Sequence, residues 1–452
     1  MRHSRLKSRP ILSLALFALL ILAVLGYGVG GSQPTAVASE ASTVVQAPLA
    51  AGATRAAETV LPTPRPTTAA SRRAAPLASR FVARPGDRVT WVRPGVVHIQ
   101  RTTTDPLRIN LLLFDLVDPA FELKVRVGWG WLSGRHRTTT MANEMDALAA
   151  VNGDLFSTDN GAPQGLMMTG GQVLTAPKYR ATFAWSRDSG PFIGYFTREW
   201  TWLAEVESAD GARSPVTLLN MRCPRDQICL FNSFARTVPA REGEVRVLLN
   251  QRGLVEQIVR GEALTIKPGK QVLVGSGLGA RWLLAQADLG DKLIVRTTTD
   301  PPLARFDEAI SGGPIILSGG AFVQDCLCAL HDCSQTREPE AKLICEDFST
   351  DWKLRHYLGV RMPRTGVGFD RSATTLIVAV VDGYQRGYSR GVTQREFADL
   401  FLEFGADTAM ELDGGGSSTM VLEGSLVNRP PDQTGERYVA NALLLFWRDI
   451  SE

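Results

Sequence analysis

The sequence predicts an α/β, or mixed α+β, fold with a mixed β-sheet core, a parallel strand-helix-strand unit near the C-terminus and a β-rich middle segment. Residues 374–381 form a continuous apolar, β-branched run, which is typical of a strand buried on both faces. Residues 393–404 have helical periodicity, and residues 408–412 return to strand-like residues. A strand-helix-strand unit of this size is almost always a right-handed crossover between parallel strands. Residues 201–305 contain short apolar stretches separated by turn residues, so we expect them to be β-rich.

The N-terminus indicates export or membrane anchoring. Basic residues precede an apolar run over residues 11–29, and residues 36–38 read Ala-Val-Ala, as at a signal-peptide cleavage site. The apolar run is also long enough to span a bilayer. Residues 1–38 are therefore either a cleaved signal peptide or an uncleaved anchor. Both place the rest of the chain outside the cytoplasm, in the extracellular space or at the cell envelope.

Residues 39–80 are rich in Ala, Thr, Pro and Ser and cannot form an ordered core, so we expect a disordered linker. This linker would hold a catalytic domain, residues 81–450, away from a membrane or wall. The formal net charge is +3, and no basic stripe is interleaved with aromatic residues. The charge pattern therefore gives no case for nucleic-acid binding.

The first part of the domain alternates short strands and turns. Residues 107–114 and 121–127 show the period-2 pattern of half-buried strands. A short helix that begins at Thr139 then leads the chain to Asn152 and Asp154, which flank a glycine after an apolar stretch. We expect this polar pair in a loop at a strand end. An Asx turn is the structural alternative.

Six cysteines fit an oxidising compartment. The simplest arrangement joins Cys223 to Cys229 and makes two further bridges within residues 324–351, which look like an inserted loop at the rim. The alternative in that loop is a zinc site formed by its first three cysteines and His331. The even cysteine count favours disulfides. The cysteines of the loop are Cys326, Cys328, Cys333 and Cys345.

The C-terminal unit carries the strongest candidate site. Thr393 and Glu396 form a capping box that begins the helix, and Gly405 ends it. Both flanking strands would end at one edge of the sheet, which would bring Asp382 and Asp413 together. The residues after Asp413 form a flexible turn whose amides and hydroxyls can bind an anion; a glycine turn capped by the aspartate is the alternative. The members of this turn are Gly414, Gly415, Gly416, Ser417 and Ser418.

Motifs in order along the chain resemble the phosphodiester glycosidase family. They read AAVNGDLF at 149–156, GAPQGLMMTGGQVL at 161–174, AISGGPIILSGG at 309–320, RTGVGFD at 364–370 and ELDGGGSSTMVLEG at 411–424. The resemblance covers roughly residues 107–447. It implies hydrolysis of a sugar-1-phosphodiester, such as a GlcNAc-1-phosphodiester, on cell-envelope or extracellular polysaccharide. The family commonly has Gly and Phe where this chain has Asp154 and Leu155, and Asn where it has Glu411.

Residue chemistry and the resemblance together assign roles. Asp413 and Asp382 would be the carboxylate pair that acts on the glycosidic bond, one of them as nucleophile or base. Arg364 and Thr365, with the glycine turn, would hold the phosphodiester, because an arginine offers a planar fork of donors. The residues expected to orient the sugar or to line the pocket are Asn152, Asp154, Ser311, Gly312 and Asn428.

Two other functions stay open. A metal-dependent phosphodiesterase would cut the other P–O bond with Ca²⁺ or Mg²⁺ held by carboxylates. A non-catalytic module would bind envelope polysaccharide without turnover. The additional carboxylates at positions 154 and 411 favour this alternative, because their negative charge would repel a phosphate. The glycosidase requires no cofactor, although a structural Ca²⁺ is compatible with it. The candidate metal ligands are Asp154, Asp382, Glu411 and Asp413.

Overall fold

The structure is a computed structural model that describes residues 77, 81–196, 204–325, 343–344, 346, 348 and 360–448. All of these described residues belong to one compact unit, which lies within Arg65–Glu452. The N-terminal segment, nearly all of the linker and the second group of cysteines lie outside the described residues, so the predictions for them stay predictions. Among the helices that are described, none is both long enough and apolar enough to cross a membrane.

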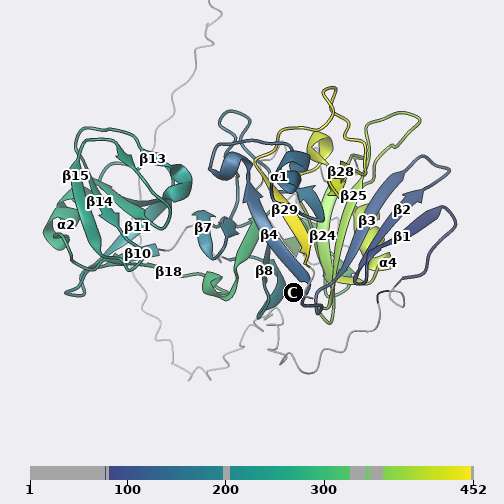
Figure 1. The fold of residues 1–452 in the computed structure, drawn as a ribbon, viewed down its shortest axis with the longest axis horizontal. Coiled ribbons are helices and arrows are strands. Elements are labelled where there is room, and N and C mark those ends of the chain that lie inside the picture. The colour runs from purple at the N-terminus through teal and green to yellow at the C-terminus, as the bar shows by residue number, and fades with distance from the viewer. Residues whose placement is uncertain are drawn as a thin grey trace, which may run out of the picture. The chain divides into compact units, whose positions relative to one another are not determined.

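An antiparallel sheet with the strand order β1-β2-β3-β25-β24-β26-β20-β21 forms the first layer (Figure 1). Helix α4 (Gln394–Glu403) covers one face, where Phe397 and Phe401 share an apolar cluster with Ile377. The strands are β1 (Asp87–Arg93), β2 (Val96–Thr102), β3 (Arg108–Asp115), β20 (Ile315–Ser318), β21 (Ala321–Phe322), β24 (Arg364–Asp370), β25 (Thr375–Val381) and β26 (Ala406–Glu411).

The opposite face of this sheet packs against a second antiparallel sheet, in the order β28-β27-β5-β29-β4. Val378 of β25 lies in one apolar cluster with Val151 and Leu443 of the second sheet, so the two sheets share a core. Helix α1 (Thr138–Glu144) packs on the outer face of this sheet. Its strands are β4 (Phe121–Val127), β5 (Ala149–Asn152), β27 (Met420–Leu422), β28 (Ser425–Leu426) and β29 (Asn441–Trp447).

A third sheet, in the order β7-β6-β19-β8-β9, extends the same core. Phe183 and Ile310 from its strands join the cluster that the first two sheets share. Its strands are β6 (Met167–Thr169), β7 (Gln172–Thr175), β8 (Thr182–Ser186), β9 (Gly190–Gly194) and β19 (Glu308–Ser311), and two residue pairs, β22 (Gln324–Asp325) and β23 (Leu343–Ile344), form a small separate ladder.

Residues 204–297 form a further sheet, β15-β14-β17-β12-β11-β10-β18, with apolar clusters of its own. Helix α2 (Leu278–Gln286) adds Leu283 to one of them. The strands are β10 (Ala204–Glu207), β11 (Arg213–Leu219), β12 (Ile228–Asn232), β14 (Glu244–Leu249), β15 (Val255–Arg260), β17 (Gln271–Ser276) and β18 (Ile294–Thr297), with the short pair β13 (Thr237–Val238) and β16 (Leu264–Thr265) beside them.

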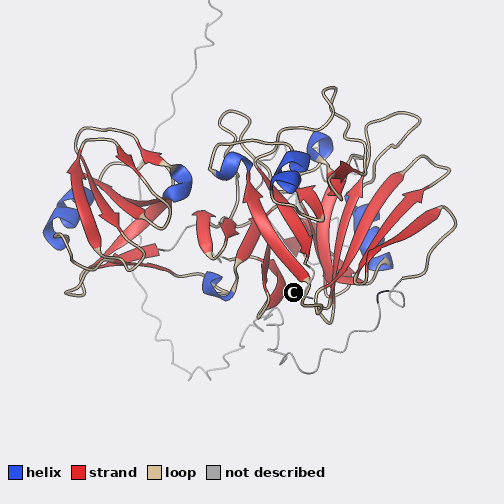
Figure 2. Ribbon diagram, viewed as in Figure 1, coloured by secondary structure: helices blue, strands red, loops and turns tan. Residues whose placement is uncertain are grey.

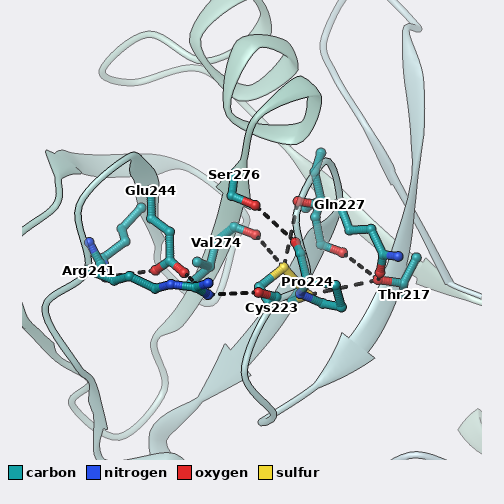
Figure 3. The surroundings of a disulfide bond; sticks show 11 residues. Thr217, Cys223, Pro224, Gln227, Arg241, Glu244, Val274 and Ser276 are labelled. Carbon is teal, nitrogen blue, oxygen red and sulfur yellow. Dashed lines mark hydrogen bonds and ion pairs between the residues drawn. A yellow bond between two sulfur atoms is a disulfide. The ribbon is translucent and has the colours of Figure 1, made fainter.

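The predicted pairing of Cys223 with Cys229 is confirmed in this region, with a Cα–Cα distance of 5.6 Å. Figure 3 shows the bond beside an ion pair: Arg241 Nη1 donates to the Cys223 carbonyl at 3.0 Å and to Glu244 Oε1 at 2.9 Å. Both cysteines are buried, so the bond fixes a loop against the sheet.

The predicted α/β class was wrong: the described residues are predominantly β (Figure 2). Strands β25 and β26 flank helix α4 in sequence, but they are not neighbours, because antiparallel β24 lies between them and pairs with both. The apolar run of β25 misled the prediction. Its two faces enter two different clusters, one shared with α4 and one shared with the second sheet. An antiparallel strand buried in this way has the same residue pattern as a buried parallel strand.

Candidate functional site

Strand β24 begins where β25 and β26 end, and we call this place the site edge (Figure 1). Arg364 pairs with Val381, the last residue of β25, and Gly366 pairs with Glu411, the last residue of β26. Because both neighbours are antiparallel to β24, they run in the same direction. The site edge therefore collects the Arg364-Thr365 pair with Asp382 and Asp413, although the strand order differs from the predicted one.

Asn152, at the end of β5, ties the second sheet to the site edge. Its Nδ2 donates to the Asp413 carbonyl at 2.6 Å, and its Oδ1 accepts from Thr365 Oγ1 at 2.8 Å and from the Thr419 amide at 3.0 Å. Asn152 and Thr365 are completely buried. Both side chains therefore hold the backbone of the site in place, whereas the sequence suggested contacts with sugar and phosphate.

Asp154 is also buried and fully engaged. Its Oδ1 accepts from Arg180 Nη2 at 3.0 Å, and its Oδ2 accepts from the Gly165 amide at 2.7 Å. Burial raises its pKa, and the positive charge of Arg180 opposes that rise. Arg180 also donates to the carbonyl of Gly312 at 2.7 Å, so this pair anchors the segment between β19 and β20.

Asp382 follows β25 and is completely buried. Its Oδ1 accepts from Asn428 Nδ2 at 2.9 Å, and both of its carboxylate oxygens accept from the Arg429 amide at 3.1 Å. Tyr388 Oη donates to its Oδ2 at 3.3 Å. Burial raises the pKa of Asp382 in spite of these donors. The side chain fastens the 428–429 segment to β25.

Arg364 forms an ion pair with Glu411, the residue that stands where the family commonly has Asn. Its Nη1 donates to both oxygens of Glu411 at 2.7 Å, and its Nε donates to the Val392 carbonyl at 2.9 Å. Arg364 is 1% exposed and Glu411 is 4% exposed. Burial raises the pKa of Glu411, and the adjacent guanidinium opposes the rise. A buried arginine paired in this way offers little to a phosphodiester.

The remaining predicted pocket residues also act as supports. Ser311 is buried, with its Oγ 2.7 Å from Thr182 Oγ1. Asn428 donates to the Ser418 carbonyl at 3.0 Å and accepts from the Met420 amide at 2.8 Å. These contacts align the glycine turn with β27.

The glycine turn is a short 3-10 helix, Gly415–Ser417, in which Gly415 has φ +60°. Several of its amides already have backbone acceptors: the Gly415 amide donates to Pro363, the Ser417 amide to Gly414 and the Ser418 amide to Gly415. The turn therefore presents fewer free amides to an anion than the sequence suggests. It acts mainly by fixing Ser417 beside Asp413.

Asp413 differs from the other acids of the site edge because it keeps partial exposure to solvent. Its dense surroundings raise its pKa to about 6, while a hydrogen bond from Ser417 and the charge of Arg437 oppose the rise. The charge of Asp154 adds to the rise. The predicted partner Asp382 is not among the groups that act most strongly on Asp413. A carboxyl with a pKa near 6 can hold or release a proton at neutral pH.

Arg437 is a site residue that the sequence analysis missed. Its Nη1 donates to Ser417 Oγ at 3.3 Å, its Nε donates to Asp432 Oδ2 at 2.6 Å, and 41% of its side chain is exposed. Gly416 packs against the guanidinium, and a Cβ at that position would lie 2.1 Å from Arg437 Nη2. The only sequence signal was its place inside the C-terminal stretch that resembles the family.

Arg437 also lines an open cavity of about 820 Å³ on the side of the site formed by residues 129–135, 156–158 and 432–438. Trp129, Trp131 and Tyr438 contribute aromatic rings to this cavity. We call it the aromatic pocket. None of its residues was a sequence candidate.

The four acids proposed as metal ligands are held by separate partners instead of converging. Within the described part of the chain, no group of three or more His, Cys, Asp or Glu side chains is placed to hold a metal ion. The cysteine cluster of the 324–351 loop, where zinc was the alternative, lies outside the described residues.

Comparisons with known proteins match the motif pattern. Residues 244–446 match the family model for phosphodiester glycosidases. The chain is 36% identical over 88 residues to N-acetylglucosamine-1-phosphodiester alpha-N-acetylglucosaminidase of Bos taurus, an alignment that covers 20% of this chain and 16% of that protein. It is 39% identical over 92 residues to the SPbeta prophage-derived uncharacterized protein YomE of Bacillus subtilis, covering 20% of this chain and 14% of that protein. These alignments thus span a small part of each curated relative.

Two solved structures have a similar fold. A hypothetical protein from Synechocystis aligns with a TM-score of 0.62 at 19% identity, over 81% of this chain and 64% of that chain. A putative exported protein from Burkholderia pseudomallei aligns with a TM-score of 0.57 at 21% identity, over 76% of this chain and 74% of that chain. At these identities the likeness concerns the fold alone.

Proposed function

We propose that this chain, which the match over residues 244–446 identifies with the phosphodiester glycosidase family, hydrolyses the glycosidic bond of a sugar-1-phosphodiester with Asp413 as the reacting carboxyl. The family match confirms the resemblance seen in the motifs. The substrate class is supported by the activity that the bovine relative's name states, although the alignment covers only 16% of that protein.

One observation carries the assignment of Asp413. The other acids of the site edge, Asp154, Asp382 and Glu411, are each 4% exposed or less and are satisfied by protein donors. Asp413 is partly exposed, and its pKa of about 6 places it near the pH at which a catalytic acid or base is most effective. It is therefore the acid of the site edge that can reach a substrate.

The chemistry follows from the leaving group. A phosphate monoester departs readily, so it needs little proton transfer from the protein, and an ionised Asp413 can act as nucleophile or as base toward water. The half-exposed guanidinium of Arg437 lies beside Ser417 and can stabilise the charge on the departing phosphate. Asp382 acts in this scheme as a positioning residue, because it holds the 428–429 segment and does not face the substrate.

The fate of a labelled oxygen tests the proposal. The purified chain is incubated with a GlcNAc-1-phosphodiester in H₂¹⁸O, with and without EDTA, and the products are identified by mass. We expect free GlcNAc that carries ¹⁸O at C1, with an unlabelled phosphomonoester. Label in the phosphate, or release of GlcNAc-1-phosphate that stops on chelation, would overturn the glycosidase in favour of a phosphodiesterase.

Action outside the cytoplasm is part of the same proposal. It is supported by the basic and apolar N-terminal segment, residues 1–38, which lies outside the described residues. The sugar chains and phosphodiesters of a cell envelope or an exopolysaccharide would be within reach of a domain placed there.

A further inference from the structure

The aromatic pocket contains a row of rings that the core does not use. Trp129 stacks on Trp131 with a centroid distance of 6.2 Å and lies 4.3 Å from the ring of His136. His136 in turn stacks on Tyr438 at 6.2 Å. Trp129 is 50% exposed and Tyr438 is 48% exposed, so about half of the surface of each residue is open to solvent.

The backbone at Trp129 is left-handed, with φ 57° and ψ 7°. A bulky side chain rarely adopts this conformation, and such strained positions concentrate at ligand sites. The surrounding loop is firmly held, because the Gly128 amide donates to Ala440 at 2.7 Å and the His136 amide donates to Val439 at 2.9 Å. The ring of Trp129 is thus pre-positioned in the pocket without being needed to fill the core.

Positive charge accompanies the rings. Arg135 and Arg437 both line the pocket, and Asp432, the acid that lines it, is already paired with Arg437. Arg236 lies over the ring of Trp131 at 4.6 Å, and Arg137 lies over the ring of Tyr438 at 5.2 Å. An anionic ligand is favoured in these surroundings.

We propose that the aromatic pocket is a subsite for an anionic oligosaccharide, the part of the polymer that continues from the phosphodiester at Asp413. The apolar face of a sugar ring presents polarised C–H groups that pack well on the electron-rich face of an indole or phenol. The volume of about 820 Å³ lies within the range of ligand sites.

The aromatic pocket is linked to Asp413 through only two side chains, those of Arg437 and Ser417. Arg437 lines the pocket and also donates to Ser417, the residue that hydrogen-bonds Asp413. A sugar chain stacked on Trp129 and Tyr438 would therefore leave its phosphate next to Arg437. The placement of this subsite on the substrate rests on the proposed function, but binding to the pocket can be measured without turnover.

The test is direct binding of tetragalacturonate to the purified chain, measured by calorimetry, with its fully methyl-esterified form as the neutral match. Asp413→Asn serves as the background, so hydrolysis cannot interfere. Trp129→Asn removes the ring with a residue that tolerates a left-handed backbone, and Tyr438→Ala is a second variant in case the first fails to fold. The control is Trp91→Ala, which removes an equally exposed tryptophan on β1.

We expect either pocket variant to weaken binding about tenfold or more, the control to leave it unchanged, and esterification of the ligand to weaken it as well. Binding that neither pocket variant affects, or no binding of tetragalacturonate at millimolar concentration, would overturn the subsite. Failure of the proposed function looks different: the wild-type chain would release no GlcNAc, yet the binding pattern would persist.

Discussion

The charged and polar residues of the site edge fall into two groups with opposite surroundings. The buried frame, whose members are Asn152, Asp154, Arg364, Asp382 and Glu411, lies at 4% exposure or less, and its polar atoms are matched to protein partners. The rim, Asp413 and Arg437, keeps part of its surface open, and Arg437 lines the aromatic pocket. Of the five charged residues that the sequence analysis proposes for the site, four belong to the frame and one, Asp413, belongs to the rim.

This difference follows from the cost of burying charge. A buried ion or amide is tolerated only with a full set of partners, so its position and identity are strictly determined by the fold. A motif residue can therefore be demanded by the architecture and have no contact with substrate. The rim needs fewer residues, and Arg437 reaches it from a loop inside the stretch that resembles the family, for which the sequence analysis predicted no role.

The largest stability effect should come from the frame. Glu411→Gln leaves the Arg364 charge buried without its counter-ion, and we expect a loss of about 3–5 kcal/mol in the free energy of unfolding. Denaturant titration measures it. The matched control is Glu423→Gln, which breaks an exposed pair with Arg93 and should cost about 1 kcal/mol or less. Equal losses of unfolding free energy in the two variants would show that the buried ion pair of the frame contributes no more than an exposed one.

Substitution of a rim residue should lower the activity and leave the stability nearly unchanged. Arg437→Gln removes the cation beside the departing phosphate, and we expect kcat/KM to fall about 10²–10³-fold. Because Arg437 holds the pKa of Asp413 down, the pH midpoint of kcat/KM should also rise above about 6 in this variant. A pH-rate profile measures both effects, with Arg225→Gln, an 89% exposed arginine of the β-rich region, as control. If the pH midpoint of kcat/KM does not shift in Arg437→Gln, the charge of Arg437 does not act on Asp413.

The smallest effect concerns the N-cap of helix α4, which belongs to neither group. Thr393→Ala removes the side chain that caps α4 and should cost about 1 kcal/mol of stability without a change in kcat. Thermal unfolding and an assay at saturating substrate measure the two quantities. A large loss of activity in this variant would show that the helix governs the site more directly than its contacts indicate.

Local patterns in the sequence were sufficient for some features. The capping box of Thr393 and Glu396, the strand predicted over 374–381 and the Cys223–Cys229 bond all depend on residues close together in the chain. The structure confirms each, with the strand at 375–381. Such signals act over a few residues, so composition and spacing carry them.

Pairings between distant segments could not be predicted in the same way. The insertion of β24 between β25 and β26 is a matter of tertiary packing, and no residue of the strand-helix-strand stretch signals it. The ion pair of Arg364 with Glu411 spans 47 positions, so an arginine that looked available for phosphate is in fact neutralised. The left-handed backbone of Trp129 could not be predicted either, because position 129 itself holds a tryptophan and not a glycine.

The central claim, that Asp413 reacts and Asp382 supports, is tested most directly by Asp413→Asn and Asp382→Asn measured side by side for GlcNAc release and for stability. Since burial raises the pKa of Asp413 from 3.8 to about 6, its ionisation opposes folding. Wild-type and Asp413→Asn should therefore be similar near pH 4, and above pH 6 the variant should be more stable, by about 1–3 kcal/mol.

We expect Asp413→Asn to lose about 10²–10⁴-fold in kcat/KM while it keeps its fold, and Asp382→Asn to lose stability but retain measurable turnover. The control Asp399→Asn, on the exposed face of α4, should change neither quantity. Wild-type turnover by Asp413→Asn, or an Asp382→Asn variant that is fully stable and inactive, would contradict the account.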